Sequence, residues 1–330
     1  MRDLTLLTEA ENPVAFFANG IGDAILTLPA LRALTEVFPE RLTLLTHGAA
    51  AYLDLLKPLA TKRQLYIESG TKCDWGDEYI NQLAAKIGKC DLFVSLVAWH
   101  SKSLGHLVDR LAPTRSIGYS PNYDVSLPLD YSKHTAELTF DAVRIISPNL
   151  RLQDYLAPPI YPERSIQMAQ DIRSALGADL RLLAVHMETL PEKLWDPAKL
   201  TEFLDRFLMH HQNFIAMFVN HSEYPLTSES ETLRDRVITQ RGLSLQDALC
   251  LVHHADYFLG ADSCMLHAAD LGRVPAVGLF GATSAAEFGF LVGPHVVIQQ
   301  SDIKGIEVER VLAAMDHLLE HPNQRAVWTH

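Results

Sequence analysis

Short apolar segments alternate with longer amphipathic segments along the whole chain. Four apolar segments in the first half have the length of buried strands: Val14–Phe17, Leu42–Thr46, Gln64–Ile67 and Asp91–Val97. The segments between them carry apolar residues at helical spacing, for example in Ala24–Val37 and Tyr79–Ile87. Strands that alternate with helices are typical of a parallel sheet covered by helices, so the pattern predicts an α/β fold.

The alternation restarts in the second half, where five more apolar segments predict strands. They are Leu182–His186, Phe214–Val219, Tyr257–Leu259, Ala276–Leu279 and Val296–Ile298. Between the two sets, Pro158, Pro159 and Pro162 exclude a helix and favour an extended linker. A chain of 330 residues is long enough for two domains. We therefore predict two doubly wound parallel-sheet domains, residues 1–160 and 161–330.

The composition is that of an ordinary folded protein, with 48% hydrophobic and 21% charged residues. No run approaches the roughly 18 apolar residues of a membrane span, and the N-terminus lacks the apolar stretch of a signal peptide. The cysteines Cys73, Cys90, Cys250 and Cys264 form no Cys-x-x-Cys pair, which argues against a disulfide framework and a cysteine zinc site. We expect a cytoplasmic protein with reduced cysteines.

The net charge is −12, from 28 basic and 40 acidic residues, and the excess of acidic residues is larger after residue 160. Such a surface repels nucleic acid, so we expect no nucleic-acid partner. It repels other anions at long range as well. An anionic ligand of the second domain must therefore be held by a few local donors.

The loop after the first strand contains Gly20, Gly22 and Asp23. Ligands of open parallel sheets bind beyond the carboxyl ends of the strands, which makes this loop a candidate site. Its glycines resemble the start of the dinucleotide fingerprint, but the third glycine is missing and Asp23 would repel a pyrophosphate. A nicotinamide dehydrogenase is thus disfavoured. Asp23 is either an acid that complements the helix dipole or a general base, for which the glycines leave a substrate room.

A second strand-to-helix corner follows the predicted strand Tyr257–Leu259 and begins with Asp262 and Ser263. The free amides at this helix start, with the Ser263 hydroxyl, would form an anion cradle for a diphosphate. The alternative is an ordinary N-cap by Asp262 or Ser263. His267 lies one helical turn further on, where a packed or capping histidine is the plainer interpretation.

Three further loops carry polar residues at the same predicted edge. Lys193 follows the first strand of the second domain and could neutralise phosphate charge, although a solvated lysine is the commoner case. Glu223 follows the second strand, from which an acidic side chain can hold ribose hydroxyls. The loop Phe280–Thr283 is either part of the site or a plain strand-exit turn. Trp195 is expected to pack and fix the lysine loop.

Several common catalytic motifs are absent. The sequence has no Gly-x-x-x-x-Gly-Lys-[Ser/Thr] P-loop, no Gly-x-Ser-x-Gly elbow and no His-Glu-x-x-His zinc helix. It also lacks the Asp-x-Asp pair that often holds a metal–diphosphate complex. His317 and His321 share a helical face, to which we assign a surface role. We expect no bound metal, so amides and cations of the chain must neutralise any diphosphate.

Four of these segments, taken in their order along the chain, resemble glycosyltransferase family 9, the heptosyltransferases of bacterial lipopolysaccharide core assembly. The segments are Gly22–Leu31, Lys193–Trp195, Asp262–His267 and Phe280–Thr283. The resemblance spans nearly the whole chain. It implies a GT-B architecture of two Rossmann-like domains facing each other across a cleft, the N-terminal one for the acceptor and the C-terminal one for the nucleotide sugar.

The resemblance also implies inverting, metal-independent transfer of heptose from an ADP-linked donor to an acceptor hydroxyl. It makes Asp23 the base, with Gly20 and Gly22 in the acceptor-side loop, and it implies that Asp262 contacts the donor sugar and Glu223 the ribose. The donor-binding residues that it implies are Lys193, Glu223, Asp262, Ser263, Cys264, Met265 and His267.

Two positions differ from the usual pattern of this family, which has glycine at Cys264 and a Pro-Gly pair where this chain has His186-Met187-Glu188. Both lie next to the expected diphosphate and bear on the identity of the donor. Two other functions stay open: a nucleotide-sugar-binding protein without turnover, and a GT-B-like sugar epimerase. The sequence names neither the acceptor nor the oligomeric state. A glycolipid acceptor would bring the chain to a membrane surface.

Overall fold

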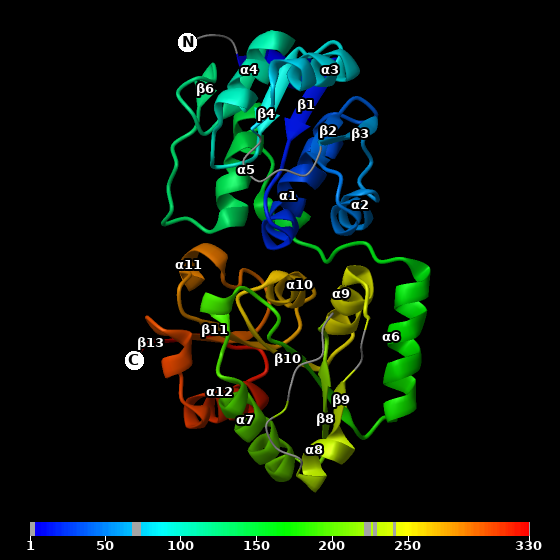
Figure 1. Ribbon diagram of the computed structural model, residues 1–330, viewed down its shortest axis with the longest axis vertical. Coiled ribbons are helices and arrows are strands. Elements are labelled where there is room, and N and C mark those ends of the chain that lie inside the picture. The colour runs from blue at the N-terminus through cyan, green and yellow to red at the C-terminus, as the bar shows by residue number, and fades with distance from the viewer. Residues whose placement is uncertain (1–3, 68–73, 221–225, 227–229, 240–241, 330) are drawn as a thin grey trace. The chain divides into compact units, whose positions relative to one another are not determined.

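The computed structural model describes residues 4–67, 74–220, 226, 230–239 and 242–329. The chain divides into two compact units, residues 1–156 and 157–330, close to the expected boundary at residue 160. Each unit has its own parallel sheet, with six described strands in the first and seven in the second (Figure 1). The predicted α/β class with two parallel sheets is confirmed.

The sheet of the first unit has the strand order β3-β2-β1-β4-β5-β6. Its strands are β1 (Pro13–Phe16), β2 (Thr43–His47), β3 (Arg63–Ile67), β4 (Leu92–Ser95), β5 (Arg115–Gly118) and β6 (Val125–Ser126). The order reverses between the neighbours β1 and β4, so the connections that follow them lead to opposite edges. Such a switch point is where open α/β sheets bind ligands.

Helices cover this first sheet. They are the 3-10 helices η1 (Leu4–Glu9) and η2 (Leu152–Tyr155) and the α-helices α1 (Ile21–Val37), α2 (Ala50–Leu56), α3 (Asp77–Ile87), α4 (Lys102–Leu111) and α5 (Thr135–Ile146). Helix α1 packs against α5, and α3 packs against α4. Every residue of α1 from Ala24 to Leu31 is buried, as expected of a helix that is apolar almost all round.

The sheet of the second unit has the order β13-β12-β11-β10-β7-β8-β9. Its strands are β7 (Arg181–His186), β8 (Phe214–Phe218), β9 (Val237–Thr239), β10 (Tyr257–Ala261), β11 (Ala276–Phe280), β12 (His295–Gln299) and β13 (Arg325–Thr329). The row of residues that crosses its centre contains two glycines, since Gly260 pairs with Gly278 on one side and with His186 on the other. A Cβ atom on Gly260 would lie 2.5 Å from the Phe258 ring, so this position requires glycine.

The helices of the second unit are α6 (Glu163–Leu176), η3 (Pro191–Lys193), α7 (Pro197–His210), α8 (Glu231–Arg236), α9 (Leu245–His253), α10 (Cys264–Leu271), α11 (Ala285–Phe288), η4 (Ile303–Gly305) and α12 (Val308–Glu320). Helix α7 packs against α8 and α12. Helix α9 packs against α10 and against α6, which lies alongside it (Figure 1).

The core of the second unit includes an aromatic cluster beneath α7. The rings of Phe203 and Phe207 stack with centroids 5.4 Å apart, and Trp195 packs against Phe203. Trp195 is fully buried, and its indole N–H donates to the Ile306 carbonyl at 2.9 Å. Trp195 therefore fixes the loop that carries Lys193, as the sequence predicts.

All nine predicted strands are present, and their ends differ from the predicted ones by at most two residues. The first helix begins at Ile21 rather than at Ala24, which places Asp23 inside its first turn. The short strands β5, β6 and β9 and the edge strand β13 were not predicted. No helix in the described part of the chain has the length and apolar character needed to cross a bilayer.

Candidate functional site

Asp23 lies at the carboxyl edge of the first sheet, in the first turn of α1 and next to the switch point between β1 and β4. Gly20 is the N-cap of α1 and has extended backbone, so no side chain caps the helix there. A Cβ atom on Gly20 would lie 3.6 Å from Oδ2 of Asp23, which shows that the carboxylate stands over this glycine. Asp23 is partly buried. Its position suits both a first-turn acid and a base at the mouth of a site.

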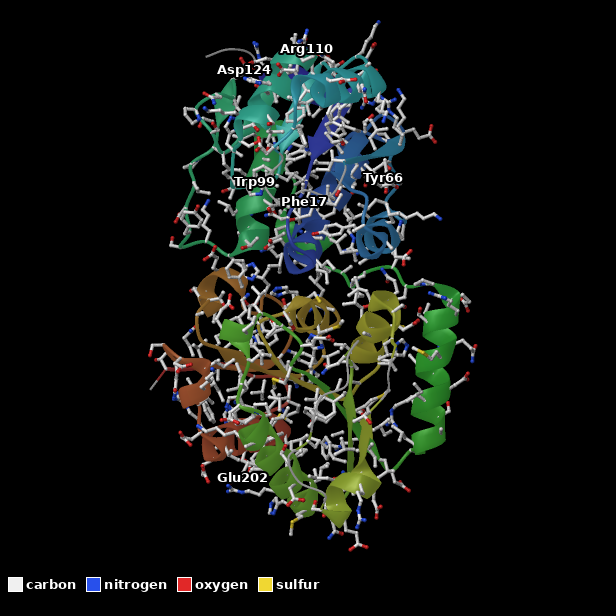
Figure 2. The ribbon with its side chains drawn as sticks, in the orientation of Figure 1. Phe17, Tyr66, Trp99, Arg110, Asp124 and Glu202 are labelled. Carbon is white, nitrogen blue, oxygen red and sulfur yellow. The ribbon has the colours of Figure 1, made fainter. Side chains whose placement is uncertain are left out.

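A hydrogen bond connects the loops that follow β1 and β4, close in sequence to Asp23. The indole N–H of Trp99, which follows β4, donates to Oδ1 of Asn19, which follows β1. The Trp99 ring also meets Phe16 edge-on, with centroids 5.9 Å apart. Figure 2 labels Trp99 and Phe17, the two aromatic residues at these strand exits. The loops after β1 and β4 are thus held together by the Trp99 side chain.

Tyr52 of α2 is a further neighbour of Asp23. Its ring is buried and meets the His47 ring at the end of β2, with centroids 5.3 Å apart. Burial raises the pKa of the Tyr52 phenol, and the negative charge of Asp23 raises it further. Tyr52 therefore stays a neutral phenol at physiological pH.

The second unit gathers polar groups around Asp262, which follows β10 and is almost fully buried. Its Oδ2 atom accepts hydrogen bonds from the Lys193 ammonium at 2.6 Å and from the Thr283 hydroxyl at 2.7 Å. Nε2 of His267 lies 3.7 Å from Oδ1 of Asp262. The Thr189 hydroxyl donates to the Asp262 backbone carbonyl at 3.1 Å. The loops that follow β7 and β11 thus converge on this one residue, which itself follows β10.

The start of α10 carries no side-chain cap. Ser263 is its N-cap residue, but neither Ser263 nor Asp262 accepts a hydrogen bond from the first-turn amides, so the N-cap interpretation of this corner is wrong. The Asp262 carboxylate turns to Lys193 and Thr283 instead. The Ser263 hydroxyl oxygen is buried and has no hydrogen-bond partner among the described residues. An uncapped helix start of this kind offers amide donors to an anion.

Cys264 is the first residue of α10, at the position where a smaller residue was expected. Burial raises the pKa of its thiol to about 11. The amides of Cys264 and Met265 oppose this shift, while the charges of Glu188 and Asp262 add to it. The thiol is therefore neutral and unreactive at physiological pH. The carboxylate of Glu188 is therefore close enough to the start of α10 to affect the Cys264 thiol.

Gln299, at the end of β12, holds the loop that presents Thr283. Its side-chain oxygen accepts from the Ala285 amide at 2.8 Å, and its side-chain nitrogen donates to the Thr283 carbonyl at 3.2 Å. The same loop presses on η4, because a Cβ atom on Gly281 would lie 2.6 Å from the Ile303 nitrogen. One amide side chain and one glycine thus fix where the Thr283 hydroxyl points.

His186, at the end of β7, ties two strand exits together. Its Nδ1 lies 3.1 Å from the Val219 carbonyl and its Nε2 lies 2.9 Å from the Glu188 carbonyl. Burial lowers the pKa of this imidazole, so it is neutral. A neutral ring has one N–H and donates to only one of the two carbonyls.

The structure brings together several of the predicted site residues, namely Lys193, Asp262, Ser263, Cys264 and His267, at one edge of the second sheet. Lys193 is paired with Asp262 and is not a solvated surface lysine. Met265 and His267 are buried within α10. Asp23, Gly20 and Gly22 lie in the first unit. Glu223 lies outside the described residues.

The sequence did not indicate Thr189 or Gln299. It placed Thr283 in a candidate loop but did not predict its hydrogen bond to Asp262. Their contacts depend on which strand ends are neighbours, since Thr283 follows β11 and reaches Asp262 after the adjacent β10. A strand order deduced from the Rossmann pattern would have placed Thr283 beside Asp262. No such signal exists for Gln299, whose side chain acts on a loop before its own strand.

Residues 113–312, well over half of the chain, match the model of glycosyltransferase family 9 (heptosyltransferase). Among curated proteins, none matches the chain significantly in sequence.

Solved structures share the architecture of the whole chain. A family 9 glycosyl transferase from Veillonella parvula DSM 2008 has a TM-score of 0.75 at 17% identity, over 94% of this chain and 97% of that one. The E. coli ADP-heptose lps heptosyltransferase II has a TM-score of 0.69 at 16% identity, over 94% and 99%. The E. coli heptosyltransferase WaaC with ADP has a TM-score of 0.66 at 14% identity, over 93% and 99%. At these identities the likeness establishes the fold.

Proposed function

Because the chain belongs to glycosyltransferase family 9 and is a glycosyltransferase with the GT-B fold, we propose that it transfers a sugar from a nucleoside diphosphate to an acceptor hydroxyl with inversion at the anomeric carbon. The donor we propose is ADP-heptose. This choice rests on the two E. coli structures, one named for ADP-heptose and one containing ADP. The acceptor class is a carbohydrate or glycolipid of the lipopolysaccharide type that the first of these names mentions.

One observation carries the donor site: a partly buried lysine, paired with a buried aspartate, lies beside a helix start that no side chain caps. A diphosphate brings negative charge, and the acidic surface of the chain offers it no general attraction. The amides at the start of α10 and the Lys193 ammonium are local donors of the required kind. The buried Ser263 hydroxyl adds a further donor.

The ion pair with Asp262 does not use up Lys193. An ammonium has three N–H donors, so it can keep the bond to Asp262 and still donate to a phosphate oxygen. Asp262 then acts as the group that holds Lys193 in place, and Thr283 holds Asp262. This assignment changes the expected role of Asp262, because its Oδ2 atom faces Lys193 and Thr283 rather than a sugar hydroxyl.

The reaction we propose is a single displacement. The Asp23 carboxylate takes the proton of the acceptor hydroxyl, and the hydroxyl oxygen forms a bond to the anomeric carbon. The bond from that carbon to the diphosphate oxygen breaks, and the oxygen leaves with the electron pair. The growing negative charge is met by Lys193 and the α10 amides, without a metal ion. Attack opposite the leaving group inverts the anomeric configuration.

A thermal-shift screen with ADP-heptose and with UDP-, GDP- and dTDP-sugars tests the donor, because a ligand that binds the native state raises its stability. We expect ADP-heptose to give the largest shift. Transfer to a core-oligosaccharide acceptor is then followed by NMR of the product, which should have the inverted anomer, and should continue in excess EDTA. A retained anomer, or a loss of activity that Mg²⁺ restores, would contradict the mechanism.

The same measurements separate the alternatives. Binding of a nucleotide sugar without transfer to any acceptor would indicate a binding protein. A changed sugar nucleotide formed without acceptor would indicate an epimerase.

A further inference from the structure

Glu188 lies in a fixed stretch of backbone beside the start of α10. It comes two residues after the end of β7, and its carbonyl lies 2.9 Å from Nε2 of the buried His186. The next residue is fixed as well, because the Thr189 hydroxyl donates to the Asp262 carbonyl at 3.1 Å. Asp262 directly precedes Ser263, the N-cap residue of α10. The backbone on both sides of Glu188 is therefore attached to the groups around this helix start.

The Glu188 carboxylate adds negative charge at this place. The side chain is only partly buried, and its charge raises the pKa of the thiol of Cys264, the first residue of α10. The charge of Asp262 acts in the same direction, but Asp262 has a counter-charge in the Lys193 ammonium, whose Nζ lies 2.6 Å from its Oδ2 atom. One ammonium offsets one carboxylate. Glu188 therefore brings a charge that the Lys193–Asp262 pair does not neutralise.

A carboxylate at this place opposes the ligand proposed for it. The α10 amides and Lys193 are the donors for a diphosphate, and like charges a few ångströms apart repel each other. A residue without charge at position 188 would leave the diphosphate unopposed. Glu188 thus weakens the binding of every anion here, and it weakens most the binding of the anion that carries the most charge.

The transfer reaction changes the charge of the bound ligand. A diphosphate that joins a nucleoside to a sugar carries about two negative charges, one on each phosphate. When its bond to the anomeric carbon breaks, the freed oxygen keeps the electron pair, and the terminal phosphate gains a second ionisation with a pKa of about 6. The released nucleoside diphosphate therefore carries close to three charges at neutral pH. Repulsion by Glu188 is stronger for this product than for the donor.

We propose that Glu188 sets the preference of this site for a nucleotide sugar over the nucleoside diphosphate product, and thereby favours release of the product. The inference rests on the proposed function, because it assigns the start of α10 to the donor diphosphate. Glu188 is then a specificity-determining residue that acts through its charge. The alternative is a hydrogen bond from a sugar hydroxyl of the donor to the Glu188 carboxylate, and the two predict opposite changes in affinity.

The test is calorimetry on the full chain with adenosine, ADP-heptose and ADP, which differ in charge. Glu188→Gln should leave the affinity for adenosine unchanged, tighten ADP-heptose roughly two- to threefold and tighten ADP roughly tenfold, because each ligand charge is relieved of repulsion. Added salt should reduce both gains, since it screens a partly exposed carboxylate. Glu188→Asp keeps the charge and should bind like wild type. Melting curves verify that both variants fold.

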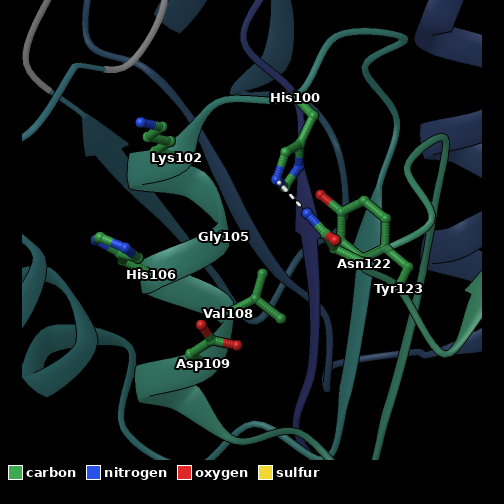
Figure 3. Close-up of a pocket in the computed structure, with 8 residues that line it drawn as sticks. All are labelled: His100, Lys102, Gly105, His106, Val108, Asp109, Asn122 and Tyr123. Carbon is green, nitrogen blue, oxygen red and sulfur yellow. Dashed lines mark hydrogen bonds between the residues drawn. The ribbon is translucent and has the colours of Figure 1, made fainter.

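Two other carboxylates serve as matched controls. Glu192→Gln removes an exposed charge from η3, in the same loop as Glu188. Asp109→Asn removes a charge from α4 in the first unit, where Asp109 lines a cavity of about 440 Å³ (Figure 3). Both change the net charge as Glu188→Gln does. Neither should alter the ratio of the ADP and ADP-heptose affinities by more than about twofold, since exposed charges act weakly at a distance.

A transfer assay measures the consequence for turnover. ADP should inhibit Glu188→Gln at roughly tenfold lower concentration than wild type, while the single-turnover rate should not fall, because the lost carboxylate only opposed the charge on the leaving oxygen. Weaker binding of ADP-heptose by Glu188→Gln, equal gains for ADP and ADP-heptose, or a fallen single-turnover rate would overturn the inference and leave the transferase function standing. If wild type binds neither ADP-heptose nor ADP, the proposed donor site fails and the inference fails with it.

Discussion

Asp23 and Asp262 are both acidic residues at strand-to-helix corners, but they differ in burial and in the groups around them. Asp262 is almost fully buried and accepts from an ammonium and a hydroxyl, so its charge is compensated within the protein. Asp23 is only partly buried and stands over a glycine that has no side chain to cover it. Of the two carboxylates, that of Asp23 is therefore the one that remains partly accessible from outside the protein.

Asp23→Asn should keep the fold and the affinity for the donor while turnover falls by roughly 100-fold or more, because the amide cannot take the acceptor proton. Steady-state kinetics together with donor titration by calorimetry measure the two effects. Asp54→Asn, an exposed carboxylate in α2, is the matched control and should retain wild-type turnover. Equal turnover in Asp23→Asn and wild type would remove Asp23 from the mechanism.

Lys193→Ala should weaken binding of the nucleotide sugar by roughly 1.5 to 3 kcal/mol, the value of a hydrogen bond to a charged group. It should also lower stability, because the buried Asp262 carboxylate loses its counter-charge. Calorimetry with adenosine, ADP and ADP-heptose separates the two effects, since adenosine lacks the phosphates and should bind unchanged.

The control for this lysine is Lys199→Ala, in which another paired lysine of the same unit is removed from Glu307. It should not alter binding of any of the three ligands. If Lys193→Ala loses equal affinity for adenosine and for ADP, the variant is misfolded. If its affinity for ADP and ADP-heptose is unchanged, the phosphates bind elsewhere.

The sequence could place Lys193, Asp262 and His267 at one edge of the second sheet, because each lies in the loop or helix that follows a strand. It could not predict that Lys193 bonds to Asp262, since 69 positions separate them and only the strand order brings their loops together. Gln299 could not be predicted for the same reason, because its side chain bonds to backbone groups of a loop 14 to 16 residues earlier in the chain.

At the scale of elements, buried strands were easier to predict than edge strands. Central strands such as β10 and β11 are buried along their whole length, so they are apolar throughout. Strand β13 is different, because Arg325, Val327 and Thr329 are exposed and only the residues between them turn inward. Five residues with only two inward-facing apolar positions are too short a pattern to separate from a polar tail.

Asp247 joins two helices of the second unit. Its carboxylate accepts from the Ser165 hydroxyl in α6 at 2.6 Å and from the Ser244 hydroxyl at the N-cap of α9, also at 2.6 Å. Burial by itself raises the pKa of Asp247, but these hydrogen bonds and the charge of Arg164 outweigh it and hold the pKa below its usual value.

The lowered pKa of Asp247 makes its contribution to stability depend on pH. A carboxyl group with a depressed folded-state pKa stabilises the protein above its unfolded value of about 3.9, and the contribution is lost as pH falls through the folded value. Urea unfolding should therefore show a difference in stability between wild type and Asp247→Asn at pH 7, and this difference should shrink as the pH falls below about 4. The exposed Asp235→Asn should show no gap at either pH, and a constant gap for Asp247→Asn would rule out this linkage.

At the scale of the whole molecule, the charge of −12 opposes the arrival of any anionic ligand, whereas the proposed nucleotide-sugar site would act through nearby hydrogen-bond donors. Salt screens the long-range repulsion more than it screens the partly buried Lys193. The association rate of a fluorescent ADP analogue should therefore rise, by roughly two- to tenfold, as ionic strength goes from 10 to 150 mM. Stopped-flow mixing measures this rate. A rate that falls with added salt would mean that a positive local field steers the donor.

The edge strand β13 covers the edge of β12 in the second sheet. It pairs with β12 along its whole length, and Arg310 bonds to its Trp328 carbonyl at 2.8 Å. Without it, the backbone groups of β12 would form an open edge on which a strand of another molecule could pair. With β13 in place the free edge of the sheet is this strand instead, and there an arginine already binds one of the backbone carbonyls that a neighbouring chain would need.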